Sequence, residues 1–110
     1  MLCHCSEPPF NFQDYEVTDV GVDETNGRFG EVTLHRCRKC GTLWLKYLIE
    51  LEAFSNSGRW YRGQITPEQA KSLTPENAAT ILASLEWHFY GGSYFNSTGA
   101  RANGGTMVDL

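Results

Sequence analysis

Four cysteines, placed as two close pairs, constrain this chain more than any other feature of its sequence. Cys3 and Cys5 lie near its start, and Cys37 and Cys40 follow after 31 intervening residues. Thiolates at such short spacings suit a tetrahedral metal ion, because each short loop brings two sulfur atoms to one ion. The commoner arrangement has two C-x2-C pairs separated by about 15–20 residues. We therefore expect a structural zinc site whose ligands are all four cysteines.

The sequence leaves open the identity of the metal and of one ligand. Iron fits the same tetrahedral sulfur cage as zinc. His4 and His35 lie close to the cysteines in sequence, and either imidazole is an alternative to one thiolate. An ordinary, partly exposed side chain is the simpler interpretation of each histidine. Disulfide pairing requires an oxidising compartment, for which the sequence gives no signal.

The segment Arg36–Trp44, with the sequence RCRKCGTLW, resembles the metal-binding turn of zinc-ribbon and rubredoxin-like proteins. In those families a C-x-x-C-G turn is followed three residues later by an aromatic residue, and the metal is mostly structural. The resemblance covers the turn and the N-terminal pair, not the whole chain. It implies Cys37 and Cys40 as ligands, completed by Cys3 and Cys5. The C-x-C spacing of the first pair departs from the commonest pattern of these families.

Length and composition predict one globular domain over residues 1–110. The apolar fraction of 41% is that of a folded protein, and 110 residues allow one modest core. No stretch reaches the roughly 20 apolar residues of a membrane-spanning helix. The first cysteine also leaves no room for a signal sequence before it. We therefore expect a cytoplasmic protein that is not bound to a membrane, with its oligomeric state left open.

Alternating apolar and polar residues predict an antiparallel β meander. The clearest alternation runs over twelve residues, from Leu43 to Phe54. Asn26-Gly27 suits a tight hairpin turn. The four predicted strands span residues 15–22, 29–37, 43–54 and 59–65.

Two helices are expected after the strands. Thr66-Pro67 and Thr74-Pro75 each supply an N-capping threonine and a proline at the first helical position. Apolar residues spaced by three and four carry the second helix towards Tyr90, and Gly91-Gly92 would end it. The predicted fold class is thus α+β, a zinc-ribbon-like domain with a four-stranded antiparallel β meander, two C-terminal helices and a four-cysteine zinc site.

Basic residues cluster around the second cysteine pair. Residues 35–62 carry six bases and two acids, although the whole chain has a net charge of −4. With Trp44, Trp60 and Tyr61 interleaved, this stretch suggests a zinc ribbon that binds nucleic acid by stacking on single-stranded bases. The overall acidity weakens that interpretation, because a basic domain is the usual footprint of nucleic-acid binding. A solvated rim that balances the thiolate charge is the simpler alternative.

Aromatic residues are dense in residues 57–63 and 87–95. Trp, Tyr and Arg dominate the binding energy of protein interfaces. For any one ring, packing in the core is the simpler interpretation, but a core this small cannot hide all fourteen rings. The predicted partner-binding residues are Arg38, Lys39, Arg59, Trp60, Tyr61, Arg62, Trp87, Tyr90 and Tyr94.

The sequence favours a non-enzymatic, zinc-stabilised domain that binds a protein partner. An immunity or antitoxin-type partner protein would suit its small size and acidity. The alternatives are the nucleic-acid-binding zinc ribbon and a small metalloenzyme. A catalytic zinc needs an open ligand position and a nearby acid or base. The deaminase, H-E-x-x-H and G-x-S-x-G signatures are all absent from the sequence.

Overall fold

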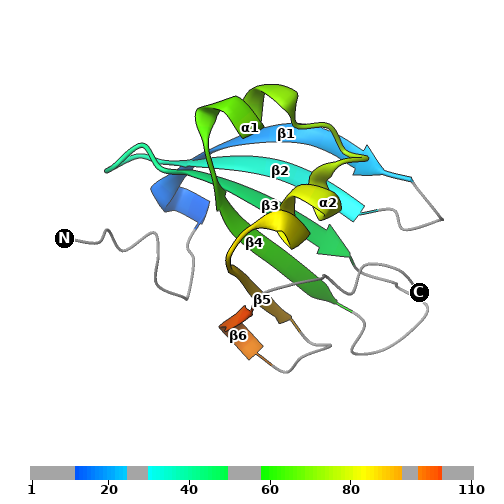
Figure 1. The fold of residues 1–110 in the computed structure, drawn as a ribbon. Helices are drawn as coiled ribbons and strands as arrows, with labels where there is room; N and C mark the ends of the chain where they lie inside the picture. The colour runs from blue at the N-terminus through cyan, green and yellow to red at the C-terminus, as the bar shows by residue number, and fades with distance from the viewer. Residues whose placement is uncertain (1–11, 25–29, 50–57, 93–96, 103–110) are drawn as a thin grey trace.

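A computed structural model describes residues 12–24, 30–49, 58–92 and 97–102. Within these ranges the chain forms one six-stranded antiparallel sheet whose strands follow one another in sequence order (Figure 1). A short 3₁₀ turn, η2 (Phe12–Asp14), precedes the sheet, and helices α1 (Pro67–Ser72) and α2 (Ala78–Ser84) connect the fourth strand to the fifth. The strands are β1 (Tyr15–Asp23), β2 (Gly30–Cys37), β3 (Leu43–Ile49), β4 (Arg59–Ile65), β5 (His88–Gly92) and β6 (Ser97–Ala102).

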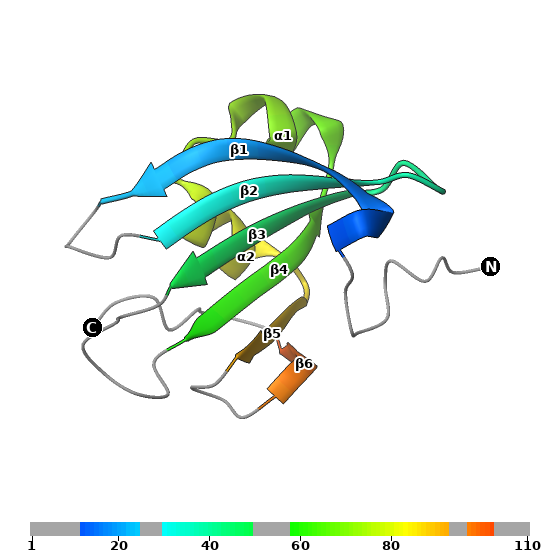
Figure 2. The ribbon, with the colours of Figure 1, turned by 180° about the vertical axis from the view of Figure 1, so that it is seen from behind.

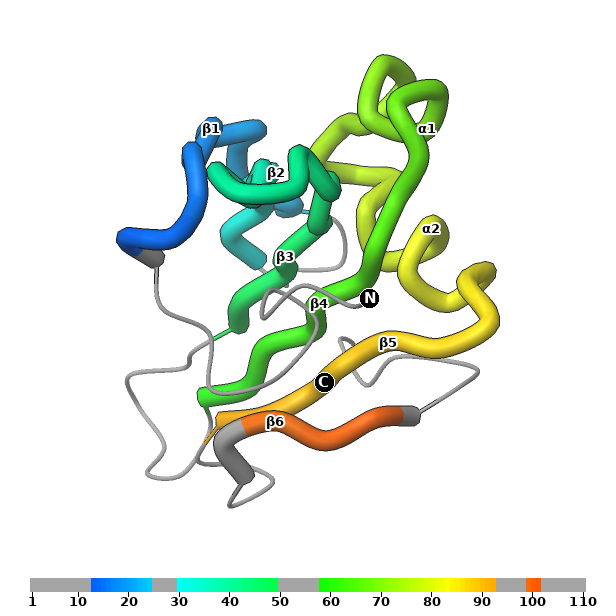
Figure 3. Tube along the Cα trace, turned by 90° about the vertical axis from the view of Figure 1, so that its left-hand side faces the viewer, coloured from blue at the N-terminus to red at the C-terminus, as the bar shows by residue number. Residues whose placement is uncertain are grey.

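Both helices lie on one face of the sheet. Figure 1 shows them in front of the strands, and Figure 2, turned by 180°, shows the strands in front of them. The tube in Figure 3 places α1 and α2 together on one side of β3 and β4. We call this side the helix face and the opposite side the helix-free face. None of the described helices is long and apolar enough to cross a lipid bilayer.

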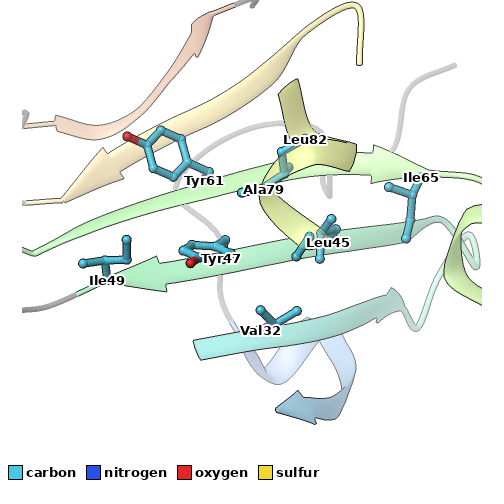
Figure 4. Close-up of a cluster of buried hydrophobic side chains, with 9 residues drawn as sticks. Val32, Leu45, Tyr47, Ile49, Tyr61, Ile65, Ala79 and Leu82 are labelled. Carbon is cyan, nitrogen blue, oxygen red and sulfur yellow. The ribbon is translucent and has the colours of Figure 1, made fainter. Parts of the chain in front are cut away.

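The helix face holds the larger apolar core (Figure 4). Alternate residues of the strands point towards the helices, as the pleat requires. Among the polar groups on this side, the Tyr47 hydroxyl donates a 2.7 Å hydrogen bond to buried Asp23. The buried members of this core are Val32, Leu45, Tyr47, Ile49, Tyr61, Ile65, Ala78, Ala79 and Leu82.

Helix α1 begins where the sequence places it. The Gln69 N–H donates to the Thr66 hydroxyl at 3.1 Å, and the Thr66 N–H donates to the Gln69 side chain at 2.9 Å. These reciprocal bonds satisfy two backbone donors that the first turn leaves without helical partners. Pro67 follows at the first helical position, where its missing N–H costs nothing.

The predicted fold class is wrong: the sheet has six strands, not four, and the helices are inserted within it instead of following it. The four predicted strands do occur and are the first four of the sheet, although residues 50–54 of the third lie outside the described ranges. Helix α2 ends at Ser84, and Leu85 is already extended. His88–Gly92 therefore forms a strand, so Gly91-Gly92 does not end a helix.

The prediction failed in the second half because local spacing there is ambiguous. Residues spaced by three and four fit a helix as far as Phe89, but a run of Trp, His, Phe and Tyr also has high strand propensity. Pairing of Tyr61 with Tyr90 and of Arg62 with Phe89 decides for a strand. Strand β6 pairs with β5 but has a Gly- and Ala-containing sequence without an apolar alternation that would predict it.

Candidate functional site

The second cysteine pair occupies the turn between β2 and β3. Cys37 is the last residue of β2 and is buried, whereas Cys40 lies in the turn and is exposed. The Cys37 N–H donates to the Thr42 carbonyl at 2.9 Å, and the Gly41 N–H donates to the Cys37 carbonyl at 2.9 Å. Gly41 closes the turn with φ of +77°, a conformation that favours glycine.

The segment that leads into β1 is attached to the same turn. The Arg38 N–H donates to the Asp14 carbonyl at 3.0 Å, and Tyr15 pairs with Cys37 in the β1–β2 register. Cys3 and Cys5 lie outside the described residues. Eight residues separate Cys5 from Asp14, so an extended chain over these nine steps reaches about 30 Å at most. The chain is therefore long enough for Cys3 and Cys5 to reach the turn that carries the second pair.

The structure describes two of the four predicted ligands. Among the side chains in the described ranges, no group of three or more His, Cys, Asp or Glu residues is arranged to hold a metal ion. Two sulfur atoms on one turn fit half of a tetrahedral thiolate site, so a complete site requires donors from outside these ranges.

His35 is engaged with other side chains on the helix-free face. Its Nε2 lies 2.9 Å from the Thr33 hydroxyl, and its Nδ1 lies 3.4 Å from the Arg62 guanidinium. Burial, and then the charges of Arg62 and Lys46, lower the pKa of His35 from 6.5 to about 4. Both ring nitrogens thus have protein neighbours, an arrangement that argues against His35 as the fourth ligand. His4 lies outside the described residues.

Exposed cations surround the cysteine turn. Arg36, Arg38 and Lys39 are all exposed. They line a hollow of about 330 Å³ together with Glu16, Cys37, Cys40 and Gly41. The Cys40 sulfur lies 3.0 Å from the Thr42 hydroxyl. The turn is therefore a locally basic surface on an acidic protein, as its sequence predicted.

A buried arginine lies at the centre of the helix-free face. Arg62 is 2% exposed, and its guanidinium carbon lies 4.4 Å from the centre of the Tyr15 ring and 4.9 Å from the centre of the Trp44 ring. Contact with the negative faces of aromatic rings stabilises a cation. Burial and the charge of Arg62 also lower the pKa of neighbouring Lys46. Cation–ring contacts thus take the place that aliphatic packing has on the helix face.

A second stack of rings lies beside this arginine. Trp44, Trp87 and Phe89 have ring centres 5.2–6.2 Å apart, in tilted and edge-to-face arrangements. Arg101 of β6 lies over this group, 4.0 Å from the centre of Trp87 and 5.5 Å from that of Phe89. Trp87 is half-buried and Arg101 is exposed, so the edge of the stack reaches the surface.

The predicted partner-binding residues divide between surface and interior. Arg38 and Lys39 are exposed, and Trp60, Trp87 and Tyr90 are half-buried. The remaining described members, Arg59, Tyr61 and Arg62, are buried.

Tyr94 lies outside the described residues. Sequence reasoning missed Arg101, because β6 was not predicted. Had β6 been paired with β5, the register Phe89–Arg101 would have placed this cation beside the aromatic group.

Comparison with known proteins does not alter this description. No protein-family model, curated protein or solved structure matches the chain. The geometry of the cysteine turn and of the helix-free face is therefore the basis for assigning a function.

Proposed function

We propose that this protein is a non-enzymatic, zinc-stabilised domain that binds a protein partner through its helix-free face. The observation that carries the proposal is the stack of exposed Arg101 on half-buried Trp87, 4.0 Å from its ring centre. Arginine and tryptophan are the residues most enriched among those that dominate interface energies. Both are held in place before binding, which lowers the entropy lost when a partner docks.

The surrounding packing supports the same surface. Trp87 rests on Phe89 at 5.2 Å and on Trp44 at 6.2 Å, and half-buried Trp60 packs against this group. A rigid aromatic base with a cation at its exposed edge is typical of the centre of a protein interface. A partner that presents carboxylates to Arg101 and an apolar side chain to Trp87 would complement this surface.

Zinc has a structural part in this proposal. Cys37 and Cys40 supply two thiolates from one turn, and Cys3 and Cys5 supply the other two from the segment attached at Asp14. Such a site would fasten the start of β1 to the β2–β3 turn. Structural zinc sites contribute on the order of 10 kcal/mol of apparent binding free energy, which a domain of this size depends on. Iron held by the same four thiolates would act in the same way.

The binding surface is tested with matched variants. Trp87→Ala and Arg101→Glu alter the stack, whereas Lys71→Ala removes an exposed cation from α1 on the other face. The wild type is cross-linked to proteins in host extract that has been treated with nuclease. We expect Trp87→Ala and Arg101→Glu to lose the cross-linked protein and Lys71→Ala to retain it. Recovery of the same proteins by all variants, with each variant folded, would contradict the assignment.

The metal is tested separately. Protein purified without added metal should contain about one zinc or iron ion per chain by mass spectrometry, and Cys37→Ser should lose both the metal and the folded state. Thr80→Ala, an exposed change on α2, is the control. A metal content far below one ion per chain, with all thiols free, would contradict the metal site. The binding surface would then still be tested by the Trp87 and Arg101 variants.

The exposed cations around the cysteine turn support nucleic-acid binding as a second candidate function. Arg36, Arg38 and Lys39 are exposed and gather around one hollow, as phosphate recognition requires. Binding of single-stranded DNA or RNA should then weaken steeply with salt and be lost in Arg38→Glu, while Arg101→Glu retains it. Failure of the wild type to bind either polymer at low salt would remove this candidate.

A further inference from the structure

Strand β1 forms one edge of the sheet, and its outer side pairs with no strand in the described part of the chain. Its only described partner is β2, in a register that shifts between Asp19 and Gly21. Tyr15–Asp19 is therefore a regular stretch of five residues before a bulge. An open edge of this kind is a template on which another extended segment adds as a new strand.

The hydrogen-bond pattern identifies which groups point outwards. Antiparallel pairs alternate between hydrogen-bonded and non-hydrogen-bonded. Arg38 N–H donates to Asp14, and the backbone of Cys37 bonds towards Thr42 and Gly41 in the turn to β3. Counting in steps of two from Asp14, residues 16 and 18 bond to β2. The backbone N–H and C=O groups of Val17 and Asp19 consequently point to the open edge.

Side chains along β1 select the class of partner. Val17 and Val22 are the exposed large apolar residues among those described, 48% and 46% exposed. Residues 12–24 contain no Lys or Arg. The exposed carboxylates along this segment are Asp14, Glu16, Asp19 and Glu24.

We infer that the outer edge of β1 is a strand-addition site for a basic, extended segment of another protein. The backbone groups of Val17 and Asp19 supply the hydrogen bonds, and Val17 supplies an apolar contact. The carboxylates of Asp19 and Glu24, which do not line the hollow with Arg36, Arg38 and Lys39, attract lysine or arginine. A second copy of this chain fits poorly, because its own β1 would bring carboxylates beside carboxylates. This edge is a different surface from the Trp87–Arg101 stack, so each is tested without the other.

A synthetic peptide of alternating lysine and valine, seven residues long and capped at both ends, is the probe. At low salt it should bind the full chain and shift the amide NMR signals of Val17 and Asp19 more than those of residues 36–41. An otherwise identical peptide with glutamate in place of lysine should not bind. A lysine–valine peptide with every amide nitrogen methylated, which blocks both of its edges, should not bind either. No binding below about 1 mM, or shifts centred elsewhere, overturns the inference.

Val17→Pro tests the edge from the side of the protein. It removes an outward N–H and leaves the bonds to β2, so the fold should persist. Loss of the hydrogen bonds around this residue should weaken peptide binding about tenfold or more, whereas Val17→Thr, which keeps the N–H, should retain it. Equal binding by folded Val17→Pro overturns the inference. Should that variant unfold, the N-methylated peptide still decides. If the wild type forms a dimer and the dimer depends on Val17, the occupant of this edge is a second copy and not a basic partner. That result would also overturn the inference.

Discussion

The two faces of the sheet are both buried at their centres but are built from different chemistry. The helix face is packed with aliphatic residues and tyrosines beneath α1 and α2. The helix-free face buries Tyr15, Cys37, Trp44 and Phe89, with the guanidinium of Arg62 against the rings of Tyr15 and Trp44.

Aliphatic packing needs only shape and area, so it suits a face that merely stabilises the fold. Rings and cations also carry directional electrostatics, and natural interfaces are enriched in them. The contrast is consistent with the proposed function, in which the helix face holds the domain together and the helix-free face binds the partner.

The largest expected loss of stability comes from a substitution on the helix-free face. It tests whether the rings of this face also support the fold. Trp44 is fully buried and packs against Trp87, Phe89 and Arg62. We expect Trp44→Ala to lower the free energy of unfolding by about 4 kcal/mol, because it leaves a cavity among the rings. Denaturant titration measures this. Trp60→Ala, a half-buried ring on the same face, should cost clearly less; equal losses would mean that burial at Trp44 does not set its contribution.

The matching test on the helix face is Leu82→Ala. Leu82 is fully buried between α2 and the sheet, where its side chain approaches Gly63. Removing its isobutyl group should cost about 3 kcal/mol. Thr80→Ala on the exposed side of α2 should change stability by less than about 0.5 kcal/mol in the same titration. If the two variants unfold at the same denaturant concentration, the packing of α2 on the sheet is not what holds this face.

A smaller change tests how tightly the helix face is packed. A methyl group on Gly30 would collide with the ring of Tyr47, which is fully buried. Gly30→Ala should therefore cost about 2 kcal/mol through overpacking. In a Tyr47→Leu background the same change should cost much less, and this double-mutant cycle reports the contact directly. Additive effects of the two changes would contradict a collision at this site.

The smallest effect concerns pH and the histidine on the helix face. His88 is buried beside Tyr61, and burial lowers the pKa of its imidazole below the ordinary 6.5. As the pH falls below 6.5, His88 takes up a proton in the unfolded chain before it does so in the folded protein. The stability present at pH 7.5 is therefore progressively lost. The wild type should lose more stability than His88→Gln between pH 7.5 and 5.0. Parallel pH profiles for the two proteins would contradict this.

The sequence by itself determined the local features. Alternation located β1 to β4, Thr66 and Gln69 predicted the start of α1, and the C-x-x-C-G pattern predicted the turn after β2. Each depends on residues close together in the chain, whose preferences act without a distant partner. The four-cysteine zinc site remains a prediction, with two of its ligands on that turn.

Only the tertiary structure decided the rest. Residues 88–92 became a strand because β4 offered a partner, and β6 followed because β5 then had a free edge. The same pairing brought Arg101 onto Trp87 and enclosed Arg62 between Tyr15 and Trp44. Sequence spacing cannot foresee these contacts, because strand pairing joins residues far apart in the chain and a one-residue shift in register would move each side chain to the other face.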